Sequence, residues 1–478
     1  MKNIWWVEQL KSFIVIETLL NFSRWSGSHL ANSLDQKYVP GSENHVGQQM
    51  HRCITQLFPY HRSNAGVGLR QTLSDLQDIL PIKVHEVPTG TKVFDWEVPQ
   101  EWRIKDAFIA DEAGQRIVDY CDSNLAVMSG SLPIRARMRA AELRPNLLTL
   151  KEELNPDWVP YRTAFFRDAW AFCVSHKQWA RLNQDDQEVF NVVIDSEFID
   201  GSLTYGEVTI EGQTKETILV YAHCCHPSLA NDNLSGVAVA AFLGKQLLER
   251  VARGDIPFKT YKIVFAPATI GAITWLAQNE KMTANITGGL ILSLLGDAGG
   301  FTFKQSRVES SVNRAVELVM HNRNTPFEMR PFSPFGYDER QFCSPGINLP
   351  MGCFMRTPNG EFPEYHTSAD NLEFVSPEAL ADSLDVVTEI LATLEQNFKP
   401  VNLHPFCEPQ LGNRGLYRAF GEHDDRGRFQ EAVMWILNQA DGTKDLLAIA
   451  KHCELPMKLV REAADVLVEH ELLGFSEA

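Results

Sequence analysis

No run of about 18 uncharged apolar residues, the length a helix needs to cross the hydrocarbon layer, occurs anywhere in the sequence. A membrane span is therefore not expected. The start of the chain is apolar but is interrupted by Glu8, Lys11 and Glu17. It also lacks the basic start and the small-residue cleavage site of a secretory signal. We interpret this segment as an amphipathic helix packed on the core, and we expect a cytoplasmic protein.

Positive charge is scarce. The chain has 44 Lys and Arg residues against 61 Asp and Glu residues, which gives a formal net charge of −17. Proteins whose main task is to bind nucleic acid present a basic surface to the phosphates. We therefore expect no nucleic-acid partner.

Paired cysteine motifs are also missing. The nine cysteines are odd in number and lie scattered among apolar neighbours. This distribution is typical of reduced, buried thiols and not of a disulfide framework.

The length of 478 residues exceeds the roughly 250–300 at which a single core stops growing, so several domains are expected. Helical patterns in residues 1–79, followed by alternating strands and helices in 186–400, predict an α/β domain with a buried mixed sheet. Short alternating runs punctuated by turn residues predict an inserted β-rich lid domain at 80–185. Three short helical patterns in 410–478, two of them at helix-turn-helix spacing, predict a third domain.

The segment "HCCHPSLANDNLSG", from His223 to Gly236, lies where an apolar strand gives way to a helix. Ligand sites of α/β sheets lie beyond the carboxyl ends of the strands. The imidazoles of His223 and His226 together with the Asp232 carboxylate suit zinc. The alternative is that Asp232 caps the helix while the histidines form local hydrogen bonds. Cys224 and Cys225 are interpreted as packing residues.

Two later segments add candidates. "YHTSADNLEFVSPE" places His366 four residues before Asp370, just ahead of a helix that Ser376 is predicted to cap. Alone it reads as a loop histidine with a capping aspartate, but with the first segment it supplies a further metal ligand. "SPFGYDERQFCSPGINLP" carries Asp338 and Glu339 in a loop that is a solvated turn in the simplest interpretation.

Together the three segments resemble the zinc aminopeptidases of the clan of bacterial leucyl aminopeptidase and glutamate carboxypeptidase. The chain is most similar to an aminopeptidase-like family found beside polysaccharide-biosynthesis genes. In that family the β-rich insert carries strings that here read "HEVPTGTKVFDWEVPQEWRIKDAFI" and "PYRTAFFRDAWAFC". The family also ends in a winged-helix-like tail, so the resemblance covers essentially the whole chain. It implies a zinc-aminopeptidase-like mixed sheet flanked by helices, an inserted β-rich domain and a winged-helix-like C-terminal domain.

The resemblance also implies roles for residues. His226, Asp232 and His366 would bind zinc, with one ion per chain. His223 is either a fourth ligand or the counterpart of the clan's first histidine at the strand end. Asp370 would orient His366 from outside the ligand set, a contact that raises ligand basicity.

The sequence departs from this family in three places. Ser293 stands where members with two metals have an aspartate, so one zinc is expected. Ala268, in "PATIGAI", replaces the glutamate that the family uses as general base. The insert also lacks histidines that the family shows near Ala126 and Leu148.

Asp338, Glu361 and Glu364 are candidate catalytic residues. Asp338 stands where the clan has an aspartate near the wall of the metal site. Glu361 and Glu364, just before His366, are either replacement bases or solvated loop residues.

Two hypotheses remain open. The first is a zinc-dependent aminopeptidase-like amidohydrolase that acts on a small peptide or amide, with impaired or redirected catalysis because of Ala268. The second is a catalytically degenerate scaffold that binds metal or a partner. A long chain with an added helical tail is compatible with a homodimer.

Overall fold

The computed structural model describes residues 43–151, 155–165, 167–323, 325–414, 416 and 426–475. The amphipathic helix predicted at the N-terminus lies outside these residues. The chain forms two compact units, Asn44–Gln396 and a second one that contains Asn397–Ala478. No helix in the described ranges combines the length and the apolar character that crossing a lipid bilayer requires.

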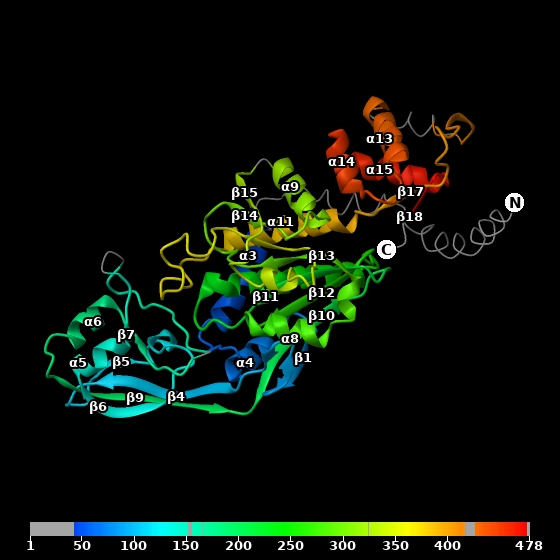
Figure 1. Ribbon diagram of the computed structural model, residues 1–478. Coiled ribbons are helices and arrows are strands. Elements are labelled where there is room, and N and C mark those ends of the chain that lie inside the picture. The colour runs from blue at the N-terminus through cyan, green and yellow to red at the C-terminus, as the bar shows by residue number, and fades with distance from the viewer. Residues whose placement is uncertain are drawn as a thin grey trace. The chain divides into compact units, whose positions relative to one another are not determined.

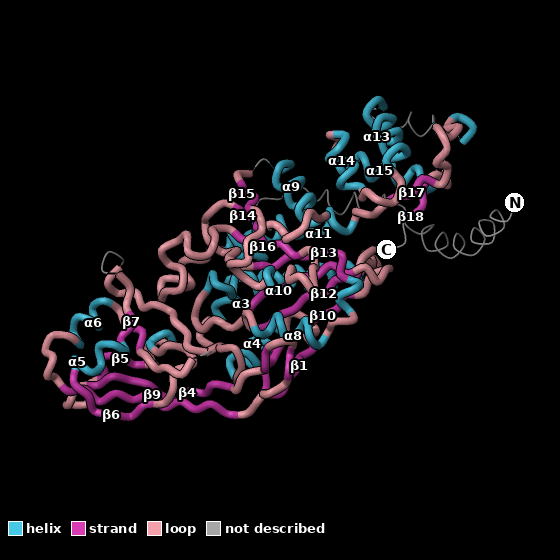
Figure 2. Tube along the Cα trace, viewed as in Figure 1, coloured by secondary structure: helices cyan, strands magenta, loops and turns pink. Residues whose placement is uncertain are grey.

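A mixed sheet organises the larger unit (Figures 1 and 2), and eight strands of the described chain belong to it. Its centre is parallel: β11 pairs with β12 and β13, and β13 pairs with β16. Antiparallel pairs flank this centre, since β10 joins β1 to β12 and β14 joins β16. β15 lies parallel to β14 at the edge. In spatial order the strands are β1 (Lys83–Pro88), β10 (Ser202–Ile210), β12 (Thr260–Ala266), β11 (Thr217–His223), β13 (Ile286–Leu292), β16 (Met351–Met355), β14 (Phe301–Lys304) and β15 (Phe327–Arg330).

Helices cover both faces of this sheet. All seven residues of β11 are buried, as a parallel strand packed on two sides requires. On one face α7 packs so closely on β12 that a Cβ at Gly244 would lie 2.7 Å from Ile263 Cδ1. The helices of this unit outside the β-rich module are α3 (Glu43–Leu57), α4 (Val67–Leu76), α7 (Gly236–Ala252), α8 (Ile270–Gln278), α9 (Ser311–Arg323), α10 (Glu339–Phe342) and α11 (Pro377–Glu395). The predicted α/β fold with a mixed sheet flanked by helices is confirmed.

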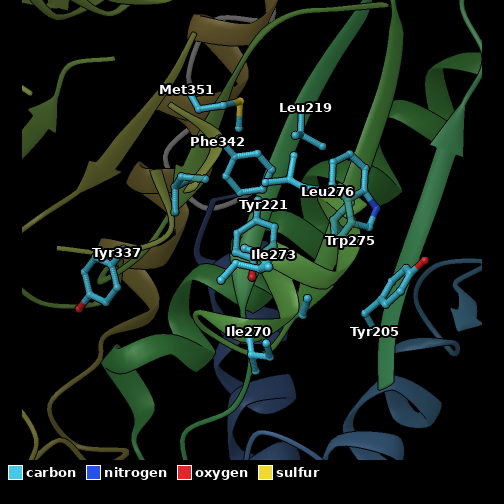
Figure 3. Close-up of a cluster of buried hydrophobic side chains, with 14 of the residues drawn as sticks. Tyr205, Leu219, Tyr221, Ile270, Ile273, Trp275, Leu276, Tyr337, Phe342 and Met351 are labelled. Atoms are coloured by element: carbon cyan, nitrogen blue, oxygen red, sulfur yellow. The ribbon is translucent and has the colours of Figure 1, made fainter. Parts of the chain in front are cut away.

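The opposite face carries an aromatic core between the sheet and helices α8 and α10 (Figure 3). The ring centroid of Phe342 lies 5.2 Å from that of Tyr221 and 6.1 Å from that of Trp275. Side chains alternate between the faces of a strand, so His223, two residues after Tyr221, points to this same side. The histidine thus extends the core toward the C-terminal end of β11.

The parallel strands β11 and β12 end side by side. His223 is in register with Ala266, and the N–H of Cys224 donates to the Ala266 carbonyl at 3.1 Å. Ala268 follows two residues later, so the two strands deliver His223 and Ala268 to the same end of the sheet, as the sequence predicts.

A β-rich module interrupts the unit between β1 and β10 (Figure 1). Its main sheet has the order β5-β4-β9-β6. An apolar core that includes Trp102, Phe172 and Phe190 fills it. The elements of the module are β2 (Lys92–Val93), β3 (Trp96–Glu97), β4 (Glu101–Ala110), β5 (Arg116–Asp119), β6 (Ile134–Arg139), α5 (Ala140–Leu143), β7 (Leu147–Leu148), β8 (Phe172–Cys173), α6 (His176–Leu182) and β9 (Val189–Ile199).

Strand pairing gives this module limits that differ from the predicted 80 and 185. β1 begins at Lys83 but pairs with β10 in the large sheet. β9 runs on to Ile199 but pairs with β4 and β6 in the module. An alternating pattern identifies a strand but not the sheet it joins, because the partner is distant in sequence.

The C-terminal unit contains a three-helix core. α13 (Arg426–Gln439), α14 (Leu446–Cys453) and α15 (Met457–Glu469) contact one another. β17 (Pro400–Asn402) and β18 (Leu473–Phe475) pair in antiparallel fashion. Asp445 caps α14 by accepting a hydrogen bond from the N–H of Ala448 at 2.8 Å. The helical tail predicted for 410–478 thus also draws in residues 400–402 through β17.

The cap predicted for α11 is present. Ser376 has an extended backbone, and its Oγ accepts a hydrogen bond from the N–H of Ala379 at 3.1 Å. Pro377 occupies the first helical position, where its lack of an N–H costs nothing.

We expect Ser376→Ala to lower the free energy of unfolding by about 1 kcal/mol, the usual cost of a lost N-cap. The midpoint of chemical unfolding, followed by circular dichroism, measures this. Ser333→Ala, at an exposed loop position, is the control and should change stability by less than about 0.5 kcal/mol. Equal midpoints for the two variants would contradict the capping role.

Candidate metal centre

One buried carboxylate gathers three imidazoles. Asp232 lies in η3 (Ala230–Ser235), between β11 and α7, and is fully buried. Its Oδ1 is 3.0 Å from His223 Nε2, and its Oδ2 is 3.0 Å from His366 Nε2. His226 Nδ1 is 4.0 Å from Oδ1. His223 and His226 belong to the same corner as Asp232, and His366 comes from a loop 134 residues away, so two segments converge on this carboxylate.

Neighbouring groups fix the orientation of His223. The Asn233 amide donates to the His223 carbonyl at 3.1 Å, and the same amide nitrogen is 3.3 Å from His223 Nδ1. The ring of Tyr337 stacks on His223 at 4.9 Å, and its hydroxyl donates to Asp232 Oδ1 at 3.3 Å. His223 is thus held by the Asn233 side chain of its own corner and by Tyr337 of the loop before α10.

Tyr161, from the β-rich module, borders the other two histidines. Its ring contacts His226 and His366 edge-on, with centroid distances of 5.2 Å in both cases. Its N–H donates to the His366 carbonyl at 2.7 Å. His366 has a positive φ of 54°, in the left-handed region that side chains other than Gly seldom adopt. The β-rich module is therefore hydrogen-bonded to the backbone of the candidate ligand His366, at a residue with a strained φ.

Arg62 is hydrogen-bonded to the loop that carries His226. Its side chain is fully buried. Nε donates to the His226 carbonyl at 2.8 Å, and Nη1 donates to the Leu57 carbonyl at 2.5 Å. The guanidinium thus ties the end of α3 to the candidate ligand loop.

The electrostatics of the cluster fit a divalent metal. Burial lowers the pKa of His226 to about 3, so its imidazole is neutral. Burial alone would raise the pKa of Asp232, but the surrounding imidazoles hold it well below its usual range. His226 Nδ1 is buried, and the described residues offer it no hydrogen-bond partner. A neutral imidazole nitrogen without a partner, beside an ionised carboxylate, is the donor chemistry that zinc uses.

Asp370 has a partner that differs from the predicted one. Its carboxylate accepts hydrogen bonds from the backbone N–H groups of Asn231 at 2.5 Å and Asp232 at 2.9 Å. Asp370 therefore positions the backbone of Asp232, whereas the sequence suggested that it orients the ring of His366. The reason is that the two amides at the start of η3 point toward it and need an acceptor inside the protein. Burial raises the pKa of Asp370 to about 8.

The predicted site residues fall into two groups. Ligand atoms of His223, His226 and Asp232 lie within 4.8 Å of one another, and His366 joins them through Asp232. Glu361 does not join them, because its two oxygens bind Arg330 at 2.5 and 2.9 Å and its side chain is 48% exposed.

The remaining two candidate bases are less exposed. Asp338 is fully buried, and burial raises its pKa to about 7. It follows Tyr337 directly, so it lies one residue from a side chain of the cluster. Glu364 is half-buried, and its carbonyl accepts the N–H of Thr367 at 3.0 Å.

Three residues that contact the candidate ligands were not predicted from the sequence: Tyr161, Tyr337 and Arg62. Tyr337 lies in the segment "SPFGYDER", directly before the candidate residue Asp338. This position in the sequence is the signal that could have identified it. Tyr161 lies in "PYRTAFF", a segment that indicates the family but does not indicate that this tyrosine contacts the histidines. Arg62 has no local signal, because its contact is with a loop 164 residues away.

Comparison with known protein families assigns both units of the chain. Residues 51–397 match the family described as a domain of unknown function, DUF4910. This chain belongs to the DUF4910 family. Residues 399–474 match a winged helix-turn-helix family, so the C-terminal unit is a winged-helix domain.

One relative of this DUF4910 protein is similar over nearly its full length. It is a protein of Clostridium acetobutylicum whose name assigns it to polysaccharide biosynthesis and gives it an aminopeptidase-like domain. It is 42% identical over 438 residues, which are 91% of this chain and 98% of the relative. A crystal structure from the same species, of a protein named as a peptidase, shares 38% identity with a TM-score of 0.80. It covers 94% of this chain and 100% of that one.

More distant structures define the fold of the larger unit. A zinc aminopeptidase from Bacillus subtilis matches with a TM-score of 0.54 and 14% identity, over 73% of this chain and 94% of that one. A peptidase M28 precursor from Shewanella amazonensis matches with a TM-score of 0.52, 14% identity and coverage of 74% and 96%. The α/β domain therefore has the zinc-aminopeptidase fold.

We expect Asp370→Ala to destabilise the protein, because each buried N–H left without an acceptor costs roughly 1–3 kcal/mol. Asp370→Asn keeps one acceptor oxygen and should lose less. The midpoint of chemical unfolding is the measurement, with the exposed Asp95→Ala as control. If Asp370→Ala and Asp95→Ala unfold at the same midpoint, Asp370 does not support the backbone of Asp232.

Proposed function

We propose that this protein is a zinc-dependent, aminopeptidase-like amidohydrolase that acts on a small peptide or amide. The observation that carries the proposal is the Asp232 carboxylate, with His223 and His366 nitrogens 3.0 Å from its two oxygens and His226 at 4.0 Å. The aminopeptidase-like fold and the names of the relatives support a peptidase-like activity.

Four residues are available to hold one zinc ion. His226, Asp232 and His366 are the primary set, and His223 is either a fourth ligand or a group that orients Asp232. Bound zinc lowers the pKa of a water molecule and polarises a substrate carbonyl. Structural and catalytic zinc sites use three or four protein ligands, which this set provides.

The chain's own residues do the rest of the work. The Tyr337 hydroxyl donates to Asp232 and so keeps the carboxylate turned toward the histidines. Tyr161 closes one side of the cluster with its ring. The hydroxyl of Tyr337 is uncharged, which leaves the charge of Asp232 for the metal.

Proton transfer is the weak part of the site. The resemblance to aminopeptidase-like zinc enzymes implies a general-base glutamate at the position of Ala268, and a methyl group accepts no proton. Asp338 and Glu364 are the candidates that remain for this role. Glu361 is unsuited, since Arg330 engages both of its oxygens. A positioned base contributes roughly 10²–10⁴ in rate, so hydrolysis of ordinary aminoacyl substrates should be slow.

Ala268 also favours a second candidate function. A chain that retains the metal ligands but lacks the base is suited to act as a metal-binding scaffold. Turnover of a panel of aminoacyl amides by the zinc-loaded protein separates the two functions.

For the winged-helix domain we propose contacts with protein and not with nucleic acid. On α15 the guanidinium of Arg461 is buried, binds Asp465 at 2.9 Å and lies 5.3 Å from the ring of Phe398. It is therefore not available to phosphates, which a recognition helix must neutralise, and Lys458 is left as the exposed basic residue of α15.

Purified protein should hold about one zinc per chain, as three or four converging ligands predict. Asp232→Ala and His226→Ala should abolish zinc binding, and elemental analysis after dialysis measures this. His321→Ala, on the exposed part of α9, is the matched control and should keep its zinc. Full zinc content in both ligand variants would refute the site.

We expect Ala268→Glu to raise the hydrolysis of aminoacyl amides, by at most the ~10²–10⁴ that a positioned base supplies. Ala268→Gln is the control, because it has nearly the same size but cannot accept the proton. The quantity to compare is kcat for the zinc-loaded proteins. Rapid turnover by the unchanged protein would show that another group already serves as base.

A further inference from the structure

Arg340 carries a positive charge that has no carboxylate partner in the part of the chain that the structure describes. It lies in α10, and its side chain is half-buried. Its Nη2 donates to the hydroxyl oxygen of Thr269 at 3.4 Å, and its Nε has no hydrogen-bond partner among the described residues. Arginines that are withdrawn from water are normally paired with an acid. The guanidinium of Arg340 is therefore available to an anion.

The two acids that precede Arg340 in the chain do not pair with it. Glu339 Oε1 accepts a hydrogen bond from Lys304 Nζ at 2.6 Å, so this carboxylate is engaged elsewhere. Asp338 is fully buried, and neither of its oxygens has a hydrogen-bond partner among the described residues. Both acids thus leave the guanidinium without an ion pair.

The contact between Arg340 and Thr269 lies beside the candidate metal centre. The carbonyl of Ala268, directly before Thr269, accepts from Cys225 Sγ at 3.9 Å. The residue after this cysteine is the candidate ligand His226. Ala268 and Thr269 are only half-buried, so solvent reaches this corner. A molecule bound at the centre therefore has the guanidinium within its surroundings.

The start of α8 favours negative charge at the same corner. Thr269 precedes the first residue of this nine-residue helix, and its side chain makes no capping hydrogen bond. The N-terminus of a helix carries a partial positive charge, which adds to the full charge of Arg340. The side chain of Ala268 brings no acid to balance them.

We propose that Arg340 binds a carboxylate of the substrate, so that the amide or peptide acted on is acidic. The inference rests on the proposed function in one respect, namely that the bound acid is a substrate. A guanidinium binds a carboxylate through two parallel N–H···O hydrogen bonds, and the Thr269 hydroxyl can donate a further one. One arginine matches the single charge of a carboxylate, whereas a phosphate dianion would keep one charge without a partner.

Isothermal titration calorimetry of the zinc-loaded, full-length protein tests this inference. The probes are N-acetylglycine and succinamate, each compared with its neutral amide, N-acetylglycinamide and succinamide. We expect at least one acid to bind saturably, and its amide to bind at least tenfold more weakly. Arg340→Gln should weaken the binding of that acid about tenfold or more, as the loss of hydrogen bonds between charged groups predicts.

Three further variants separate the guanidinium from other causes. Arg340→Lys keeps the charge but loses the planar fork, so it should bind the acid with intermediate affinity. Ala268→Glu places a carboxylate on the chain next to Thr269, so it should compete for Arg340 and weaken acid binding more than Ala268→Gln does. Arg253→Gln, at the exposed end of α7, is the control and should bind the acid like the unchanged protein.

The proposal is overturned if no acid binds, if acid and amide bind equally, or if Arg340→Gln binds the acid as well as the unchanged protein does. The last result would mean that the acid coordinates zinc alone. Inorganic phosphate that binds more tightly than both acids, and loses that binding in Arg340→Gln, would overturn the choice of a carboxylate.

The proposed function and this inference fail in different ways. Acid binding that depends on Arg340, without hydrolysis of any neutral or acidic amide, would support the anion site and refute the amidohydrolase. Hydrolysis of neutral amides, without acid binding through Arg340, would support the amidohydrolase and overturn this inference.

Discussion

Everything around the candidate centre depends on the burial of one carboxylate. Removing the charge of Asp232 from water costs several kcal/mol unless partners compensate. The partners are His223 from the end of β11, His366 from the loop before α11, and the Tyr337 hydroxyl from the loop before α10. Asp370 adds support through the backbone N–H of Asp232. The ends of these elements meet at Asp232, and each contributes one polar group to it.

A second set of contacts fixes the backbone of the candidate ligands. The carbonyl of His226 accepts from the buried Arg62, and the carbonyl of His366 accepts from the N–H of Tyr161. Both donors are far from their acceptors in sequence. The ligand geometry is thus set from two directions: the side chains are drawn to Asp232, and the main chain is held by α3 and by the β-rich module.

Much of this arrangement follows from local sequence. The strand "TILVYAH", the helix capped by Ser376 and the corner that brings His223 close to Asp232 all depend on patterns within about fifteen residues. The sheet membership of β1 and β9, the partners of Asp370 and the role of Arg62 depend on contacts between distant segments. Asp370 illustrates the difference: its identity marked it as a partner in the site, but only the fold shows that it serves two amides and not an imidazole.

The backbone of His366 has a consequence for how such a chain can change. A positive φ in a residue other than glycine persists only where the surroundings impose it, and here the N–H of Tyr161 provides part of that restraint. A related protein that shortened or lost the β-rich module would release the loop and let His366 relax away from Asp232. The β-rich module and the loop of His366 therefore form one mechanical unit, and exchanging one of them without the other would remove the hydrogen bond that holds this candidate ligand.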